Sequence, residues 1–223
     1  MRKTLLCLIL IIIFSLACGS PSRSDGKPEV GVRPPAVAGQ FYPDNPARLK
    51  LAIQKYLEDA VPPKGERPLA IVVPHAGYIY SGQICADAFR QAAGQPVDVV
   101  VILGTNHTTA GFNRISVYPG GGYRTPLATT QVDETIAKAL LEADKDCVAK
   151  TEVQSQEHSV EVQLPFVQVL FPSARIVPVV VGEPDVSMCS RFGQVLATAL
   201  KGRNALIVAS SDLYHYPPYE DAV

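Results

Sequence analysis

The chain has 223 residues, of which 47% are hydrophobic and 18% are charged, and its formal net charge is −1 at pH 7. This composition is typical of a globular protein, and the length is sufficient for one domain with a substantial hydrophobic core. Because the charges are nearly balanced and no basic run occurs beyond the N-terminus, the sequence gives no electrostatic support for nucleic-acid binding.

Residues 1–18 are expected to be an export signal. Arg2 and Lys3 precede an apolar run from Leu5 to Leu16, which is too short to favour a membrane-spanning helix. Cys18 then resembles the lipid-modified cysteine of a bacterial lipoprotein, although Ser15 departs from the usual motif. We therefore expect an exported protein, anchored through lipid on Cys18 to the extracytoplasmic side of a membrane. Plain cleavage, or retention of the signal as an anchor, is the alternative.

Residues 19–35 are rich in Pro, Gly and Ser, and this composition predicts a flexible linker. A single α/β domain is expected over residues 36–223. Beyond Cys18, the domain holds Cys85, Cys147 and Cys189, an odd number without paired spacing. The sequence therefore favours neither a disulfide framework nor a thiolate zinc site, and Cys85 is expected to be buried in an Ala-rich helix.

Strands and helices alternate along the predicted domain. The first helix is expected to begin at Pro46, with Asn45 as its N-cap. Pro165 should break or kink a later helix, and Pro178 favours an edge position or a bulge for its strand. The predicted strands cover 69–73, 97–103, 115–118, 175–181 and 204–209, and the later helices cover 81–93, 133–143, 159–171 and 187–200.

This alternation predicts an α/β fold, a three-layer α/β/α sandwich around a mostly parallel central sheet. The pattern of elements stops at the charged, loop-like end PPYEDAV without a closing helix or strand. We therefore expect a C-terminal part of the domain to be missing from this chain.

Three histidines follow strands that read as buried. His75 comes after LAIVVP, His107 comes after VDVVVILGTN, and His215 comes after NALIVASSDLY, three residues beyond Asp212. Ligands of open α/β sheets collect at the carboxyl ends of strands, and imidazole with carboxylate is a common ligand set for transition metals. The pattern predicts a metal site with His75, His107 and Asp212 as ligands, while Asp212 and His215 could act as acid and base.

Four further residues are candidates for a supporting or substrate-binding role. Glu157 and His158 lie together in QSQEHSVE, where Glu157 could be a ligand or could orient a histidine. Tyr78 and Tyr214 adjoin the candidate ligands and could line a substrate pocket. Each residue also has an ordinary structural interpretation, in which the histidines and tyrosines are turn or core residues and the acids favour helix starts.

Seven segments together resemble the Memo family, known in bacteria also as AmmeMemoRadiSam system protein B. In chain order these segments are AVAGQFYP, PHAGYIYSG, ILGTNHTTAG, YRTPLA, QEHSVEVQLPFVQ, IVPVVVG and SSDLYHYPPYEDA, and they cover about residues 36–223. The resemblance implies a fold similar to class III extradiol dioxygenases and a pocket for iron or copper at His75 and His107, with Asp212 and His215 alongside. Family members add a cysteine near the C-terminus that Cys85, Cys147 and Cys189 do not match.

Two functional hypotheses follow from these observations. The first is a metal-dependent, redox or oxygenase-like protein that uses non-haem iron or copper on an unknown substrate. The second is a non-catalytic module that binds an acidic peptide or small molecule among the histidines. A purely structural surface lipoprotein, in which every histidine is a turn residue, is a third interpretation.

Overall fold

The computed structural model describes residues 31–213, 215 and 218–222. The predicted signal, its lipidation site Cys18 and most of the predicted linker lie outside these residues. No helix within the described part of the chain combines the length and the apolar character needed to cross a membrane.

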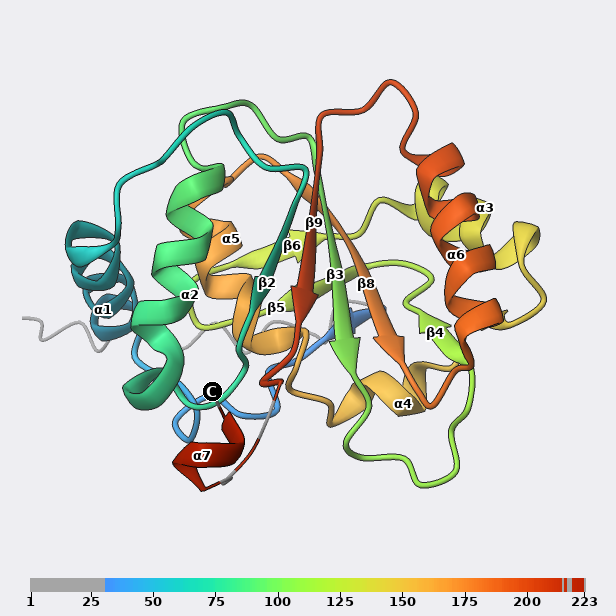
Figure 1. The fold of residues 1–223 in the computed structure, drawn as a ribbon, viewed down its shortest axis with the longest axis horizontal. Helices are drawn as coiled ribbons and strands as arrows, with labels where there is room; N and C mark the ends of the chain where they lie inside the picture. Colours follow the sequence, from blue (N-terminus) through green and yellow to red (C-terminus); the bar gives the residue numbers. More distant parts are fainter. Residues whose placement is uncertain (1–30, 214, 216–217, 223) are drawn as a thin grey trace, which may run out of the picture.

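The centre of the fold is a sheet of six strands (Figure 1). Its spatial order is β2-β9-β3-β8-β4-β7, and only the β4–β8 pairing is antiparallel, so the sheet is mixed. The strands are β2 (Ala70–Val73), β9 (Ala205–Ser210), β3 (Val99–Thr105), β8 (Arg175–Val181), β4 (Ile115–Val117) and β7 (Cys147–Val148). The predicted α/β fold is therefore confirmed.

Helices lie on both sides of this sheet and give it the layers of a three-layer α/β sandwich. The first group is α1 (Pro46–Asp59), α2 (Tyr78–Ala92) and α5 (Leu164–Leu170), and the second is α3 (Glu134–Ala143) and α6 (Val186–Ala199). Short elements complete the chain: α4 (Thr151–Ser155), the 3-10 turn η1 (Glu161–Gln163) and α7 (Tyr219–Ala222). As predicted, the Asn45 side chain caps α1 by accepting from the amide of Arg48 at 3.0 Å, and Cys85 is buried.

A small second sheet was not expected from the sequence. It consists of β1 (Val32–Arg33), β5 (Gly122–Arg124) and β6 (Thr129–Gln131) in the order β1-β5-β6. The strand β1 occupies the end of the segment predicted as a flexible linker, so ordered structure begins before residue 36. Arg33 is almost fully buried, and its guanidinium pairs with Glu161 at 2.6 Å, which fixes this end of the chain to the domain.

The two prolines behave differently from one another. Pro165 lies in the first turn of α5 and separates that helix from η1, which is the break that the sequence predicted. Pro178 was expected at an edge or a bulge, but β8 pairs with β3 on one side and β4 on the other. The prediction for Pro178 was therefore wrong. An interior strand tolerates this proline because β4 ends at Val117, so the missing N–H of Pro178 lies just beyond the β4 ladder. The carbonyl of Pro178 still accepts from the amide of Tyr118.

Candidate metal centre

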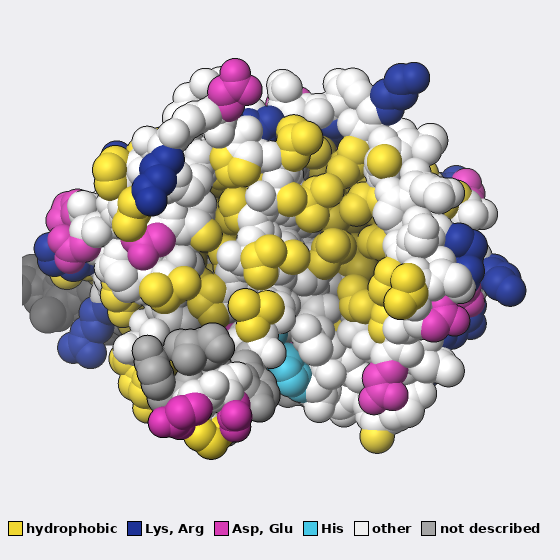
Figure 2. Space-filling view, in the orientation of Figure 1, with side chains coloured by type: hydrophobic (Ala, Val, Ile, Leu, Met, Phe, Trp, Pro, Cys, Tyr) yellow, Lys and Arg dark blue, Asp and Glu magenta, His cyan; other side chains and the backbone are white. Residues whose placement is uncertain are grey.

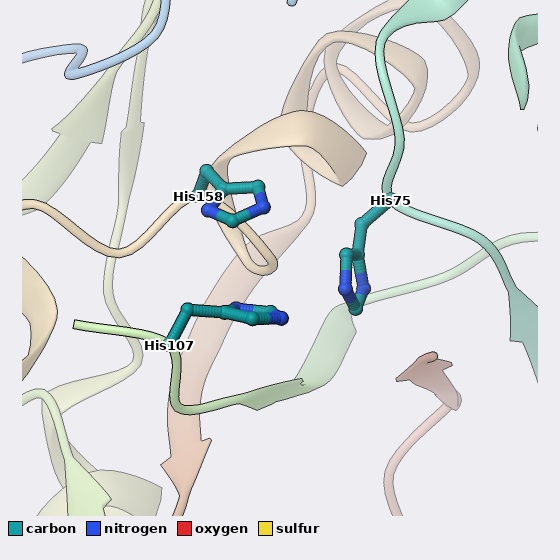
Figure 3. A group of neighbouring side chains, drawn as sticks. All are labelled: His75, His107 and His158. Atoms are coloured by element: carbon teal, nitrogen blue, oxygen red, sulfur yellow. The ribbon is translucent and has the colours of Figure 1, made fainter. Parts of the chain in front are cut away.

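Three imidazole rings meet at the carboxyl ends of the central strands (Figure 3). His75 follows β2, His107 follows β3, and His158 follows α4. The ring centroid of His75 lies 5.0 Å from that of His107 and 5.6 Å from that of His158. The centroids of His107 and His158 are 4.6 Å apart. One nitrogen from each ring lies within 4.8 Å of the other two, so the three residues form a candidate metal centre.

Hydrogen bonds determine which nitrogen of His75 carries the proton. Its Nδ1 lies 3.0 Å from the hydroxyl of Ser210. That hydroxyl donates its only proton to the carbonyl of Ser159 at 2.7 Å and accepts from the amide of Gln163 at 2.9 Å. Ser210 can therefore only accept from His75, so Nδ1 is the protonated nitrogen and the lone pair of neutral His75 is on Nε2.

Glu157 does the same for His107. The buried carboxylate lies 2.9 Å from Nδ1 of His107, which must be the donor because an ionised carboxylate only accepts. The Glu157 carboxylate also accepts from the backbone amides of His107, His158 and Ser159 at 2.6 to 2.9 Å. One side chain thus fixes the ring of His107 and the turn that carries His158.

His158 is held by packing on its other side. Its ring lies 4.7 Å from the ring of Phe41, and its Nδ1 is 3.4 Å from the Glu157 carboxylate. Gly104 allows β3 to pass directly beneath this turn, because a Cβ at that position would come within 2.8 Å of a Val160 methyl group. The close approach of strand and turn brings His158 beside His107.

Asp212 and His215 lie next to the three-histidine cluster and outside it. Asp212 accepts from the backbone amide of His75 at 2.5 Å, and its second carboxylate oxygen is 3.8 Å from His75 Nε2. That same oxygen lies 2.9 Å from Nε2 of His215, whose side chain is 57% exposed. Leu213 between them has φ of 60°, a left-handed conformation that brings the two side chains together.

The electrostatic balance of this region favours a cation. Burial lowers the pKa of His75 to about 4 and also lowers that of His158, so both rings are neutral at pH 7. Burial alone would raise the pKa of Glu157 and Asp212. Hydrogen bonds, first those from the amides of Ser159 and His75 respectively, outweigh burial and hold both carboxyl pKa values below their ordinary range.

The donor set fits a transition metal. Metal-bound histidine is neutral and usually donates its second ring N–H to a carboxylate, carbonyl or other acceptor, as His75 and His107 do here. An ion about 2.1 Å from each nitrogen needs ligands roughly 3–4 Å apart. The ligand nitrogens, which lie within 4.8 Å of one another, would therefore have to approach by at most roughly 1–2 Å.

Most of the predicted site residues lie at or beside the cluster, one is buried in the core, and one is not described by the structure. His75 and His107 lie together, and Glu157, Asp212 and His215 surround them. Tyr78 was predicted to line a substrate pocket, but it is buried in the core, where its hydroxyl donates to the carbonyl of Val162 at 2.8 Å. Tyr214 lies outside the described residues.

Sequence reasoning gave His158 only a supporting role, whereas the structure makes it one of the three clustered imidazoles. It was underestimated because it follows a short helix and not a strand. The apolar residues that follow it, in VEVQLPFVQVL, were the available signal. They bury the turn and leave its polar groups to face the site.

The fold and this cluster define an α/β protein with a candidate three-histidine metal centre. The model of the Memo-like protein family matches residues 33–223. A MEMO1 family protein of Pyrobaculum arsenaticum is 40% identical over 202 residues, which cover 86% of this chain and 72% of the relative. A MEMO1 family protein of Aquifex aeolicus is 40% identical over 195 residues, covering 86% and 70% respectively. The chain therefore belongs to the Memo family.

Proposed function

We propose that this protein binds a redox-active transition metal, iron or copper, through His75, His107 and His158. The observation that carries the proposal is the hydrogen bonding of His75 and His107. In each ring Nδ1–H donates to an acceptor, which leaves Nε2 as the nitrogen available to a metal ion. Imidazole donors suit iron, copper and zinc. Three protein ligands also leave coordination positions for a substrate or water.

The residues around the cluster suggest how such a site would work. A bound ion would supply one-electron chemistry and would polarise an oxygen atom of a substrate. Asp212 is positioned to hold the backbone of His75 and could approach the ion as a further oxygen ligand. The exposed ring of His215, hydrogen-bonded to Asp212, is the candidate group for accepting or donating a proton at the open side.

The alternative, a pocket for an acidic ligand without a metal, has weaker support. Two carboxylates, Glu157 and Asp212, adjoin the imidazoles and would repel an anion. Arg33 donates to the backbone carbonyl of Glu157, but its charge is paired with Glu161. The surroundings therefore favour a cation over an anion.

Metal titration tests the proposal. The purified chain, stripped with a chelator, is titrated with Fe(II), Cu(I) and Zn(II), and stoichiometry and affinity are measured for each. We expect one ion per chain, tighter binding of iron or copper than of zinc, and a loss of at least 100-fold in His75→Ala, His107→Ala or His158→Ala. Lys55→Ala, an exposed residue on α1, is the control. Unchanged metal affinity in the histidine variants would contradict the proposal. So would binding of an acidic ligand whose affinity is the same with and without a chelator.

A further inference from the structure

The segment that carries His158 has little regular structure of its own. Residues 156–160, between α4 and η1, belong to no helix or strand, so contacts with other parts of the chain must hold them in place. His75 and His107, by contrast, follow strands of the central sheet, and the ladders of that sheet fix them. Among the three imidazoles, His158 is therefore the one whose position depends most on tertiary contacts.

One guanidinium group holds this segment at three points. Arg33 donates to the backbone carbonyls of Gln154 and Glu157 at 2.7 and 2.5 Å. It also donates to the carboxylate of Glu161 at 2.6 Å. The three acceptors lie on either side of His158 in the sequence. The planar fork of an arginine side chain can serve several acceptors at once, which a lysine ammonium group cannot do with the same geometry.

The N-terminal arm, residues 31–37, reaches His158 by a second route. The amides of the last two residues of the arm donate to the carboxylate of Glu161 at 2.8 and 3.0 Å. The carbonyl of Val37 accepts from the amide of Phe41 at 2.9 Å. The Phe41 ring in turn packs against the ring of His158, with 4.7 Å between the centroids. The arm therefore supports both the backbone of the turn and the imidazole that the turn carries.

The start of the arm lies behind the central sheet. In Figure 1 the strand β1 (blue) passes behind the strands β9 and β3. Figure 2, in the same orientation, shows histidine atoms at the front surface, near the carboxyl ends of these strands. The strand β1 and these exposed atoms thus lie on opposite sides of the sheet, which suits a supporting element and not a cover.

We propose that Arg33 is a positioning residue of the candidate metal centre, and that docking of the N-terminal arm is coupled to metal binding. This inference rests on the proposed function. An ion would draw the three imidazoles closer together, so it binds best when the turn that carries His158 is already held beside His107. Coupling between two sites is reciprocal. An arm that strengthens metal binding is therefore itself held more firmly when the ion is bound.

The variant Arg33→Lys separates positioning from stability. Lysine keeps a positive charge beside Glu161 but lacks the fork that reaches both carbonyls. The probe is Zn(II), which is redox-silent and takes imidazole ligands. We expect the affinity for Zn(II) to fall by about fivefold or more, the usual range for coupled sites, while the metal-free variant stays folded.

The variant Arg203→Lys is the matched control, because it makes the same substitution in an ion pair away from the rings. Arg203 pairs with Asp133 at 2.9 Å. The amide of Asp133 donates to the carbonyl of Ile176 at the start of β8, whereas the histidines lie at the carboxyl ends of the strands. Its affinity for Zn(II) should equal that of the wild type.

Hydrogen exchange in the unsubstituted protein tests the coupling in the other direction. Because the amides of Ala36 and Val37 donate to the buried carboxylate of Glu161, their exchange requires the arm to open. We expect saturating Zn(II) to slow this exchange by about fivefold or more. Equal exchange with and without bound Zn(II) would overturn the coupling.

Nitrogen NMR of the metal-free protein gives a readout that does not depend on the proposed function. In Arg33→Lys the ring-nitrogen shifts of His107 and His158 should change, whereas those of His75 should stay the same, because Ser210 holds its Nδ1. If the wild type binds no ion, the proposed function fails, and this pattern alone decides the role of Arg33. If the wild type binds Zn(II), an affinity and ring shifts in Arg33→Lys that match those of the control variant would overturn the proposal and leave the proposed function intact.

Discussion

At the scale of single residues, the candidate centre depends on groups that do not themselves face the ion. Ser210, Gln163 and Ser159 form a chain of hydrogen bonds in which the proton and both lone pairs of the Ser210 hydroxyl are used. Gln163 cannot rotate its amide to donate elsewhere, because the same nitrogen also donates to the carbonyl of Pro74 at 2.8 Å. The tautomer of His75 is therefore a property of this network.

Removing the Ser210 hydroxyl should weaken metal binding while the fold remains intact. In Ser210→Ala, Nδ1 of His75 loses its acceptor and faces the Gln163 amide donor, which favours the tautomer protonated on Nε2. We expect affinity to fall about 10- to 100-fold, the usual effect of losing such a supporting contact. Isothermal titration gives the affinity, and nitrogen NMR of the His75 ring reports the tautomer. Thr198→Ala, which removes an exposed hydroxyl on α6, is the control; equal losses in both variants would contradict the expectation.

Acid should destabilise the metal-free protein through His75. Its pKa is about 6.5 in the unfolded chain and is lowered by burial to about 4 in the folded state. Below pH 6.5 the unfolded chain takes up a proton that the folded chain resists, so stability is complete above pH 6.5 and falls as the pH approaches 4. We expect a loss on the order of 2 kcal/mol, measured by urea denaturation between pH 7.5 and 4.5. His75→Gln should show a shallower decline, and an identical slope would rule out His75 as the cause.

At the scale of elements, the site depends on how closely β3 passes the turn after Glu157. Gly104 is the residue that permits this contact, since Ser159 and Val160 occupy the space that a side chain would need. The turn and the strand bring His158 and His107 to the same point. A change in their spacing should therefore affect both stability and metal affinity.

Gly104→Ala should test that spacing. The added methyl group overlaps Val160 and Ser159, and overpacking of this kind costs about 1–3 kcal/mol. Because relief of the overlap moves the turn that carries His158, metal affinity should fall as well. Gly193→Ala on α6 is the matched control, since its methyl group meets no atom within 4 Å and should be neutral or slightly stabilising. Denaturation midpoints and metal titration check both variants, and a stable Gly104→Ala protein with full affinity would disprove the spacing argument.

The elements that carry a strong local pattern were the ones that sequence could predict. The strand 175–181 was predicted with its observed limits, and Asn45 marked the start of α1, because buried runs and caps are local features. The strands β5 and β6 were missed, since each has only three residues, and a glycine turn and a threonine pair show little periodicity. His75 and His107 could be placed by the strands before them. The role of His158 depends on an approach between segments that no local pattern encodes.

At the scale of the whole molecule, a buried ion pair holds the N-terminal arm, residues 31–37, against the segment that carries the site. Glu161 is fully buried and accepts from the Arg33 guanidinium, the amides of Ala36 and Val37, and the hydroxyl of Tyr42. Arg33 also donates to the backbone carbonyl of Glu157. The arm thus supports the same segment that orients two of the three imidazoles.

Breaking this pair should therefore destabilise the domain. Arg33→Met leaves the Glu161 carboxylate buried without its counter-charge, which typically costs about 3–5 kcal/mol. The double variant Arg33→Met, Glu161→Gln removes both charges and should recover part of the loss. Chemical denaturation of the wild type, both single variants and the double variant gives the coupling energy. Strictly additive effects would show that the pair does not act as a unit.

The way the three rings are assembled also has a consequence for metal loading. They come from distant parts of the chain, and closing such long loops costs entropy before any of them can share an ion. An ion offered to the unfolded chain would find isolated imidazoles, unlike the closely spaced ligands of small zinc domains that fold around their metal. We therefore expect the polypeptide to fold first and to bind the proposed ion afterwards, so that a chelator leaves a folded apoprotein which can be refilled.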